Sequence, residues 1–374
     1  MERVMEIFKP EVEHFRVNSI KGNFFRYNGW PTVCRDDRGV LYATASSYRM
    51  SHVDPFGKNC MYMSYNEGRT WTPPIVVNDS YIDDRDTGIT YCKNGRLIMT
   101  WFSECPENCW DHLDGCEWFN RADVQVVNGI SKALKIITPE VYGKFRGSFV
   151  KVSEDYGVTW SDPIKVPVTS PHGVCCCGDG LIVYMGKPMD PDYGTNEPLT
   201  VITSRDGGYT WSFAGKVPLG EGLDEYSSMH EPHVTELPDG RLMGAIRVHT
   251  AEFYTSFVTF SEDRGKTWST PRRIAEIDGA PPHLMVHSSG AVICTYSCRT
   301  WGAMGERAVV SYDNGETWTE DYELDMHVSP NQHDLGYPAS VELSDGSIYT
   351  VYYQAFGDED MTSILATKWR LNNK

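Results

Sequence analysis

The sequence predicts an all-β fold, a six-bladed β-propeller with four-stranded antiparallel blades. A repeated turn motif, a repeated hairpin and the spacing between copies support this prediction. The turn motif Ser-x-Asp-x-Gly-x-Thr-Trp occurs five times, and self-similarity at a steady period is the mark of a repeat architecture. The five copies begin at Ser64, Ser153, Ser204, Ser261 and Ser311.

Each position of the turn motif has a structural role. An Asp or Asn side chain bonds the backbone a few residues on and forms a tight turn, and glycine supplies a positive φ. The first copy carries Asn66 where the others carry Asp. Thr suits the strand that follows, and Trp is expected to pack under the turn. We therefore assign the motif to the fold and give it no catalytic role.

Six hairpins alternate with the turn motifs. In each, an apolar run reaches a turn that ends in glycine, and a second apolar run follows, as expected for paired strands. The spacings between turn glycines are 56, 85, 60, 50 and 56 residues, close to one blade each. The long spacing predicts an insertion in the second blade, a loop over residues 104–145. The turn glycines are Gly39, Gly95, Gly180, Gly240, Gly290 and Gly346.

The sixth hairpin is followed by one more strand-like run but by no turn motif. Its fourth strand must therefore come from elsewhere, and the stretch before Phe24 is the available candidate. Such a closure would remove exposed sheet edges. The prediction is one propeller domain over residues 1–374.

Composition narrows the possible partners and the location. The net charge is −17, so nucleic acid and anionic membranes are poor partners. No secretory leader and no run of 18 apolar residues is visible, so no membrane segment is expected. The 11 cysteines, three of them consecutive from Cys175, indicate reduced thiols and a cytoplasmic location.

A cluster of potential zinc ligands has spacings that match no zinc-site pattern. We expect neither a metal nor a cofactor. The cluster comprises Cys105, Cys109, His112 and Cys116.

The five turn motifs on six blades resemble the sialidase (neuraminidase) superfamily, in which the motif is called the Asp-box or BNR repeat. The resemblance covers nearly the whole chain. Box-bearing propellers also include arabinanases, polysaccharide lyases and non-catalytic receptors. Function must therefore be argued from the site.

The resemblance implies a Tyr nucleophile, a Glu that takes its proton, an Asp acid/base and three Arg that bind a sugar carboxylate. The segment HEPHVTELPDGRLMGAIR is similar to the one that holds the Glu and one Arg, which gives Glu231 and Arg247. GYPASVELSDG is similar to the nucleophile segment, which gives Tyr337. YRMSHVDP gives Asp54 as acid/base, with Arg49 before it.

Two parts of the Arg set depart from the family pattern. Arg26, in FRYNGWPT, lies five residues before Pro31, whereas the family's Arg lies two residues before its proline. Arg299 and Arg307 both compete for the third position.

Further polar and aromatic residues lie at or near strand starts, where they could contact a substrate. A ring of histidines on one axis could serve acid/base chemistry or orient hydroxyls. These residues are Trp30, His52, the run Asp83 to Asp86 with Arg85, His172, His230, His233, His283, His333 and Asp334.

The first functional hypothesis is an exo-acting glycoside hydrolase of sialidase type, which releases a terminal acidic sugar from a short glycan with retention. A second is another glycosidase or a uronate lyase that uses the histidine-rich site. A third is a non-catalytic propeller that binds glycans.

Overall fold

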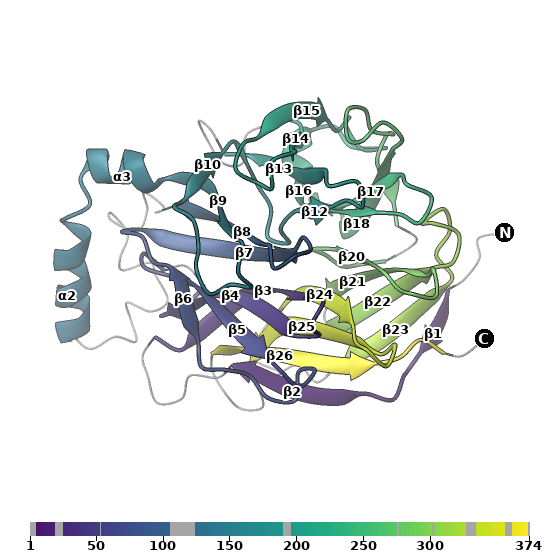
Figure 1. Ribbon diagram of the computed structural model, residues 1–374, viewed down its shortest axis with the longest axis horizontal. Coiled ribbons are helices and arrows are strands. Elements are labelled where there is room, and N and C mark those ends of the chain that lie inside the picture. The colour runs from purple at the N-terminus through teal and green to yellow at the C-terminus, as the bar shows by residue number, and fades with distance from the viewer. Residues whose placement is uncertain are drawn as a thin grey trace.

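Six antiparallel sheets are arranged around a common axis, as the repeats predict (Figure 1). The structure is a computed structural model, and it describes residues 5–18, 25–52, 54–104, 124–189, 196–274, 277–300, 303–326, 334–355 and 361–372. All six hairpin glycines have positive φ, between 73° and 87°, which explains why glycine recurs there.

Each blade takes its strands in chain order from the axis outwards. The first blade is β3 (Tyr27–Arg35), β4 (Leu41–Arg49), β5 (Lys58–Ser64) and β6 (Ile75–Asn78). The second is β7 (Asp83–Tyr91), β8 (Leu97–Glu104), β9 (Gly147–Ser153) and β10 (Ile164–Val166). The third is β11 (Val168–Thr169) with β12 (Cys175–Cys176), then β13 (Ile182–Pro188), β14 (Thr200–Ser204) and β15 (Ser212–Lys216).

The remaining blades repeat this order, and a short 3-10 turn, Tyr226–Ser228, precedes the fourth. The fourth blade is β16 (Met229–Glu236), β17 (Leu242–His249), β18 (Tyr254–Ser261) and β19 (Arg272–Arg273). The fifth is β20 (His283–Val286), β21 (Val292–Cys298), β22 (Gly305–Ser311) and β23 (Glu320–Asp325). The sixth is β24 (Gly336–Glu342), β25 (Ile348–Ala355), β26 (Thr362–Trp369) and β2 (Glu13–Asn18).

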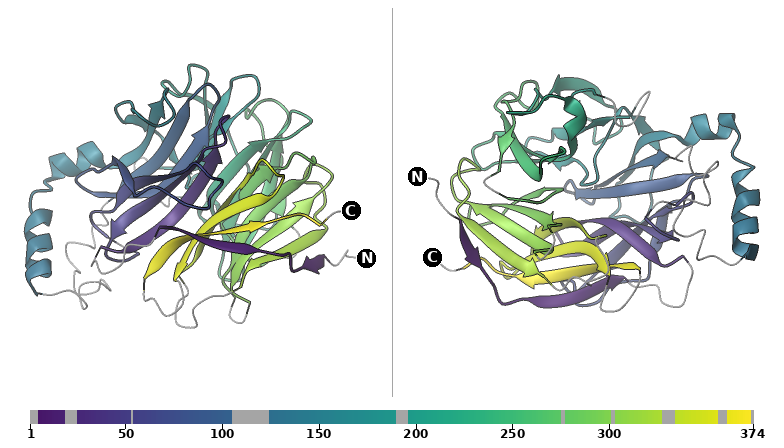
Figure 2. Two further views of the ribbon diagram at one scale, coloured as in Figure 1. Left: turned by 60° about the horizontal axis from the view of Figure 1, so that its bottom comes forward. Right: turned by 180° about the vertical axis from the view of Figure 1, so that it is seen from behind.

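The ring closes as predicted, because the N-terminal strand β2 pairs antiparallel with β26 and completes the last blade. A shorter strand, β1 (Glu6–Phe8), continues past it and pairs parallel with β23 of the fifth blade. The two chain ends therefore lie near each other (Figures 1 and 2). The sequence did not predict β1.

The apolar core lies between blades, in six clusters that each join neighbouring sheets. Between the sixth and first blades, for example, Tyr349 and Val351 pack with Ala43 and Tyr62, all fully buried. Burial of apolar area between sheets is the main favourable free energy of such a fold. No blade can bury both of its faces alone, so the ring is stable only when it is complete.

The second-blade insertion is partly helical, which corrects the prediction of a loop. Helix α2 (Val124–Leu134) and helix α3 (Pro139–Phe145) project beside the second blade (Figure 1). Thr138 caps α3 by accepting a hydrogen bond from the Val141 N–H, and Pro139 occupies the first turn. The cysteine and histidine cluster at residues 105–116 lies outside the described residues.

The prediction that all thiols are reduced is wrong at one pair. Cys92, after β7, forms a disulfide with Cys176 in β12, so the bond joins the second and third blades. The sequence did not indicate this pair because the two residues are 84 positions apart. The ring brings them together. No helix in the described part of the chain is long and apolar enough to cross a membrane.

The turn motifs are held by side-chain hydrogen bonds. Asp263 accepts hydrogen bonds from the backbone N–H and the hydroxyl of Thr267, at 2.9 and 2.7 Å, and from the Ser261 hydroxyl. Asn66 accepts from the Thr70 N–H in the same way. The motif therefore acts as the structural turn that the sequence predicted.

We expect Asp263→Ala to lower the free energy of unfolding by about 1–3 kcal/mol, because several backbone and hydroxyl donors lose their acceptor. Asp263→Asn should cost less, since Asn66 fills the equivalent position in the first blade. Urea denaturation at neutral pH measures both values. Equal stability of Asp263→Ala and the wild type would contradict this account of the turn.

Candidate functional site

Four residues at the start of inner strands have left-handed backbone conformations. Trp30, Asp86, Glu231 and Tyr337 have φ values of 53°, 53°, 45° and 54°. The strand pairing shifts register at each position, which marks a bulge. Bulges re-aim side chains, and such strained residues concentrate at functional sites. We call these four residues the entrance layer.

Tyr337 and Glu231 form the closest contact within the entrance layer. The Tyr337 hydroxyl donates a hydrogen bond of 2.7 Å to Glu231 Oε1. Arg247 Nη1 donates to both carboxylate oxygens of Glu231, each at 2.8 Å. The structure thus brings together three residues, from β16, β17 and β24, that the sequence placed in one site.

The electrostatics of this trio keep the carboxylate ionised and the phenol protonated. Burial raises the pKa of Glu231, but the charge and hydrogen bond of Arg247 outweigh burial and lower it overall. Burial and the Glu231 charge raise the pKa of Tyr337 well above its usual value. Glu231 is therefore placed and charged to accept the Tyr337 proton.

Two guanidinium groups meet over one aromatic ring. Arg247 and Arg299 lie 5.1 and 5.6 Å from the centre of the Tyr254 ring. Arg299 donates hydrogen bonds to the Leu335 carbonyl at 2.7 and 3.1 Å, and no carboxylate pairs with it among the described residues. Arg307 instead pairs with Asp321 at 2.6 Å inside the fifth blade. The structure therefore favours Arg299 over Arg307 as the second Arg of the site.

Asp86 adds a second carboxylate to the entrance layer. Its side chain is 6% exposed, and Oδ1 has no hydrogen-bond partner among the described residues. Burial raises the pKa of Asp86 to about 7, with Arg85 opposing the shift and Glu231 adding to it. Asp86 is thus coupled electrostatically to the trio around Tyr337.

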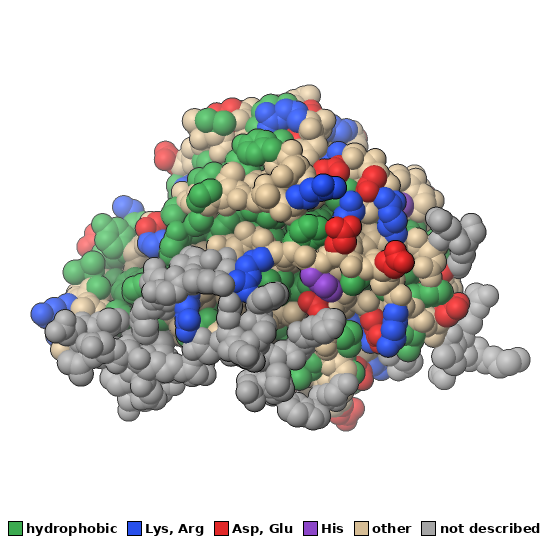
Figure 3. All heavy atoms as spheres, turned by 90° about the horizontal axis from the view of Figure 1, so that it is seen from below, with side chains coloured by type: hydrophobic (Ala, Val, Ile, Leu, Met, Phe, Trp, Pro, Cys, Tyr) green, Lys and Arg blue, Asp and Glu red, His purple; other side chains and the backbone are tan. Residues whose placement is uncertain are grey.

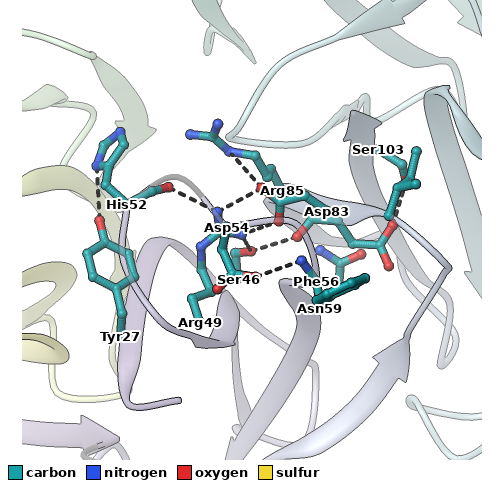
Figure 4. Close-up of polar contacts among 12 residues, drawn as sticks. Tyr27, Ser46, Arg49, His52, Asp54, Phe56, Asn59, Asp83, Arg85 and Ser103 are labelled. Atoms are coloured by element: carbon teal, nitrogen blue, oxygen red, sulfur yellow. Dashed lines mark hydrogen bonds and ion pairs between the residues drawn. The ribbon is translucent and has the colours of Figure 1, made fainter. Parts of the chain in front are cut away.

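Two predictions in the first blade are corrected. Arg49 is fully buried and forms a salt bridge with Asp83, so it cannot contact a substrate in this structure (Figure 4). Asp54 is also fully buried, and its oxygens accept hydrogen bonds from the N–H groups of Met50 and Phe56. Both residues hold the loop that follows β4. The structure therefore does not place Asp54 where the sialidase pattern expects an acid/base.

Trp30 occupies the first-blade place in the entrance layer, but its side chain is 1% exposed. The guanidinium carbons of Arg85 and Arg49 lie 4.5 and 4.8 Å from the centre of a Trp30 ring and cover it. Trp30 therefore supports Arg85 and offers no open face to a sugar, contrary to the prediction. Arg26 lies before β3, half-buried and outside the entrance layer.

His52 lies on the loop after β4, and its side chain is 45% exposed. Its Nδ1 lies 3.0 Å from the Tyr27 hydroxyl (Figure 4). The same nitrogen lies 3.0 Å from Asp334 Oδ1. Its ring stands edge-on to Trp30, with centres 4.9 Å apart. His52 thus borders the entrance layer, as the sequence predicted.

Three other histidines lie deeper in the ring. His172, His233 and His283 are buried on the third, fourth and fifth blades, with ring centres 4.2 to 5.7 Å apart. They line a cavity of about 500 Å³ toward the other end of the axis. His172 and His283 therefore line this cavity, and the ring centre of His172 lies 6.2 Å from that of Tyr337. His230, half-buried in β16, stays beside Glu231.

Two of the three histidines accept backbone hydrogen bonds on Nδ1. The N–H of Leu284 donates to Nδ1 of His233, and the N–H of Ser340 donates to Nδ1 of His283. In the neutral rings Nε2 then carries the hydrogen and offers no lone pair. Within the described ranges no group of three or more His, Cys, Asp or Glu side chains is arranged to hold a metal ion. His333 lies outside those ranges.

Sequence reasoning missed three tyrosines of the site, Tyr27, Tyr254 and Tyr353. Each lies near a strand end, where tyrosine is common and carries no specific signal. On the face drawn in Figure 3, the coloured acidic and basic side chains are intermixed and form no basic stripe.

Comparison with known proteins agrees with this fold. The model of a BNR repeat-like domain matches residues 178–355. Residues 178–355 therefore resemble a BNR repeat-like domain, and the described chain has the six-bladed propeller fold. No curated protein sequence matches the chain.

Solved structures with this fold cover almost the whole propeller. A Dyadobacter fermentans protein of unknown function is 20% identical, with a TM-score of 0.74 over 96% of this chain and 99% of that one. The intramolecular trans-sialidase of Ruminococcus gnavus, in complex with oseltamivir carboxylate, is 15% identical, with a TM-score of 0.66 over 96% of each chain. The GH93 α-L-arabinofuranosidase of Fusarium graminearum, with arabinobiose, is 12% identical, with a TM-score of 0.61 over 96% and 98%. The propeller is thus shared by glycosidases that differ in substrate.

Asp86 gives a prediction for the pH dependence of stability. Below about pH 4 the folded and unfolded states both hold its proton. As the pH rises to about 7, only the unfolded state ionises, so the wild type loses stability relative to Asp86→Asn. The gap between pKa values of 3.8 and about 7 limits the gain of the variant to about 4 kcal/mol.

Urea denaturation at several pH values between 4 and 8 measures this gain. It should grow up to about pH 7 and then level off. Asp162→Asn, at an exposed carboxylate, is the matched control and should show no such trend. A pH-independent difference for Asp86→Asn would contradict the assignment.

Proposed function

We propose that this protein is an exo-acting glycoside hydrolase of sialidase type, which releases a terminal acidic sugar from a short glycan with retention at the anomeric carbon. The observation that carries the proposal is the contact of Tyr337, Glu231 and Arg247 at the axis, with Arg299 beside it. Tyr337 is the nucleophile in this proposal. Glu231 is its base.

The charge balance of the site supports an acidic substrate. Arg247 has one carboxylate partner in Glu231, while Arg299 bonds only a carbonyl among the described residues. Two cations near one aromatic ring repel each other, and a bound carboxylate relieves that repulsion. This local positive charge lies in a chain of net charge −17, which argues that it serves a ligand.

The same charge balance favours tyrosine as the nucleophile. A carboxylate nucleophile would be repelled by a substrate carboxylate, whereas a neutral phenol is not. As the Tyr337 oxygen attacks the anomeric carbon, its proton passes along the 2.7 Å hydrogen bond to Glu231. Arg247 holds Glu231 in place from the other side.

One observation favours a second candidate, a glycosidase that acts on a neutral sugar. Trp30 occupies the first-blade position of the entrance layer, and the Arg26 segment departs from the sialidase pattern in its spacing to Pro31. The carboxylate clamp of the described residues therefore has two Arg, Arg247 and Arg299, where the sialidase pattern has three. The GH93 arabinofuranosidase shows that the same propeller can support such a reaction.

A substrate screen separates these candidates. Wild type should release fluorophore from 4-methylumbelliferyl α-sialosides, and Tyr337→Phe and Glu231→Gln should lose at least about 10³-fold in kcat/KM. The screen also includes arabinofuranosides and uronides, with absorbance recorded for an unsaturated lyase product. Cleavage of an arabinofuranoside or a uronide without any sialoside cleavage would overturn the first candidate.

Arg299 tests the carboxylate clamp separately. Arg299→Met should raise KM for the acidic glycoside about 10- to 100-fold, because a charge-assisted bidentate contact is lost. The methyl ester of the same glycoside should show little change. Arg272→Met, in the outer strand of the fourth blade, is the control. Equal effects of Arg299→Met on acid and ester would contradict the clamp.

A further inference from the structure

His52 and Asp334 form a polar pair at the edge of the entrance layer. The pair joins the loop after β4 to the residues before β24, so it bridges the first and sixth blades. The Asp334 carboxylate also accepts hydrogen bonds from the hydroxyls of Tyr27 and Tyr353, at 2.7 and 2.8 Å. The ring of Tyr353 lies 5.9 Å from that of Tyr337. A continuous set of contacts therefore connects His52 with the proposed nucleophile.

The hydrogen bonds determine which nitrogen of His52 carries a proton. The Tyr27 hydroxyl donates its hydrogen to Asp334 Oδ2. In its contact with His52, the Tyr27 oxygen can therefore only accept a hydrogen bond. The carboxylate oxygen of Asp334 is also an acceptor. Nδ1 lies between two acceptors, so it must be the protonated nitrogen. Nε2 is then free to hold or release a proton.

Asp334 is suited to orient the His52 imidazole. Burial raises the pKa of Asp334, but hydrogen bonding and charge from His52, with the Tyr27 and Tyr353 hydroxyls, lower it overall. An ionised carboxylate that accepts the Nδ1 hydrogen bond fixes the orientation of the ring.

Arg49 and Asp54, which matched the sialidase pattern, hold the loop after β4 in place. Arg49, held by Asp83, donates a 2.9 Å hydrogen bond from Nη2 to the His52 carbonyl. Asp54 holds the backbone on both sides of the loop through Met50 and Phe56. The loop is thus anchored at three points, and His52 is its exposed side chain (Figure 4).

We propose that His52, oriented by Asp334, is the general acid/base of this glycosidase, in the place where the sialidase pattern expects Asp54. This inference rests on the proposed function. It assigns catalysis to His52 and positioning to Asp334.

The two half-reactions balance. In the first, His52 Nε2–H gives its proton to the glycosidic oxygen as the C–O bond breaks toward that oxygen. The Tyr337 oxygen bonds the anomeric carbon and passes its proton to Glu231. In the second, water attacks the anomeric carbon and gives a proton to Nε2 of His52. The bond to Tyr337 breaks toward the phenolic oxygen, which recovers its proton from Glu231.

Leaving-group dependence tests the acid role. Benzyl α-sialoside needs a proton on its leaving oxygen, whereas 4-nitrophenyl α-sialoside does not. His52→Ala should lower kcat/KM for the benzyl substrate about 10²- to 10⁴-fold and for the nitrophenyl substrate much less. Added imidazole should restore part of the lost rate, and Asp334→Asn should give a smaller loss with the same dependence.

Matched variants make the result decisive. His14→Ala, in the outer strand β2, is the histidine control and should retain wild-type rates on both substrates. Equal losses of His52→Ala on both substrates, or no loss, would overturn the proposal. Leaving-group dependence in Asp86→Asn in place of His52→Ala would assign the role to Asp86. Failure of the wild type on every sialoside is a failure of the proposed function itself.

A measurement without substrate tests the pair in either case. Long-range ¹H–¹⁵N spectra of histidine-labelled protein report which ring nitrogen is protonated, with His52→Gln to assign the signal. The structure predicts a proton on Nδ1 of His52. A neutral ring protonated only on Nε2 would overturn the proposal.

Discussion

The site depends on one backbone constraint, the left-handed conformation of one residue near the start of the inner strand in four of the six blades. An L-residue with φ near 50° is strained, and the surrounding sheet must hold it there. The adjacent ladder holds it through a bulge, with regular pairing on either side. Four blades therefore aim a large or charged side chain at the axis. A regular strand would alternate such side chains between the faces of its own sheet.

The closed ring of six sheets explains why the strained backbone of the entrance layer is tolerated. The apolar contacts that stabilise the fold lie between blades, in six clusters, and two entrance-layer residues, Trp30 and Tyr337, belong to the cluster between the sixth and first blades. The strand β2 closes the last sheet and removes its free edge. Core packing and the candidate site therefore share residues at the inner strands of the first and sixth blades.

Charge in the site is arranged by pairing across blades. Glu231 is held by Arg247 and contacts Tyr337, and Asp334 bridges His52 to Tyr27 and Tyr353. Each carboxylate is ionised because donors outweigh the cost of burial. Asp86 Oδ1 has no donor among the described residues, and burial raises the pKa of Asp86 to about 7. The three carboxylates therefore differ in protonation because their partners differ.

The sequence by itself determined the propeller, its six blades, the closing strand and the segments that carry Tyr337, Glu231 and Arg247. These follow from local chemistry, since turn residues, glycine positions and strand patterns act over a few neighbours. Only the tertiary structure decided that Arg49 and Asp54 are buried in the loop support, that His172 and His283 line one cavity, and that Cys92 meets Cys176. The physical reason is that burial and partner choice depend on which blade faces which. The His52–Asp334 pair joins residues 282 positions apart, and neither residue alone signals the other.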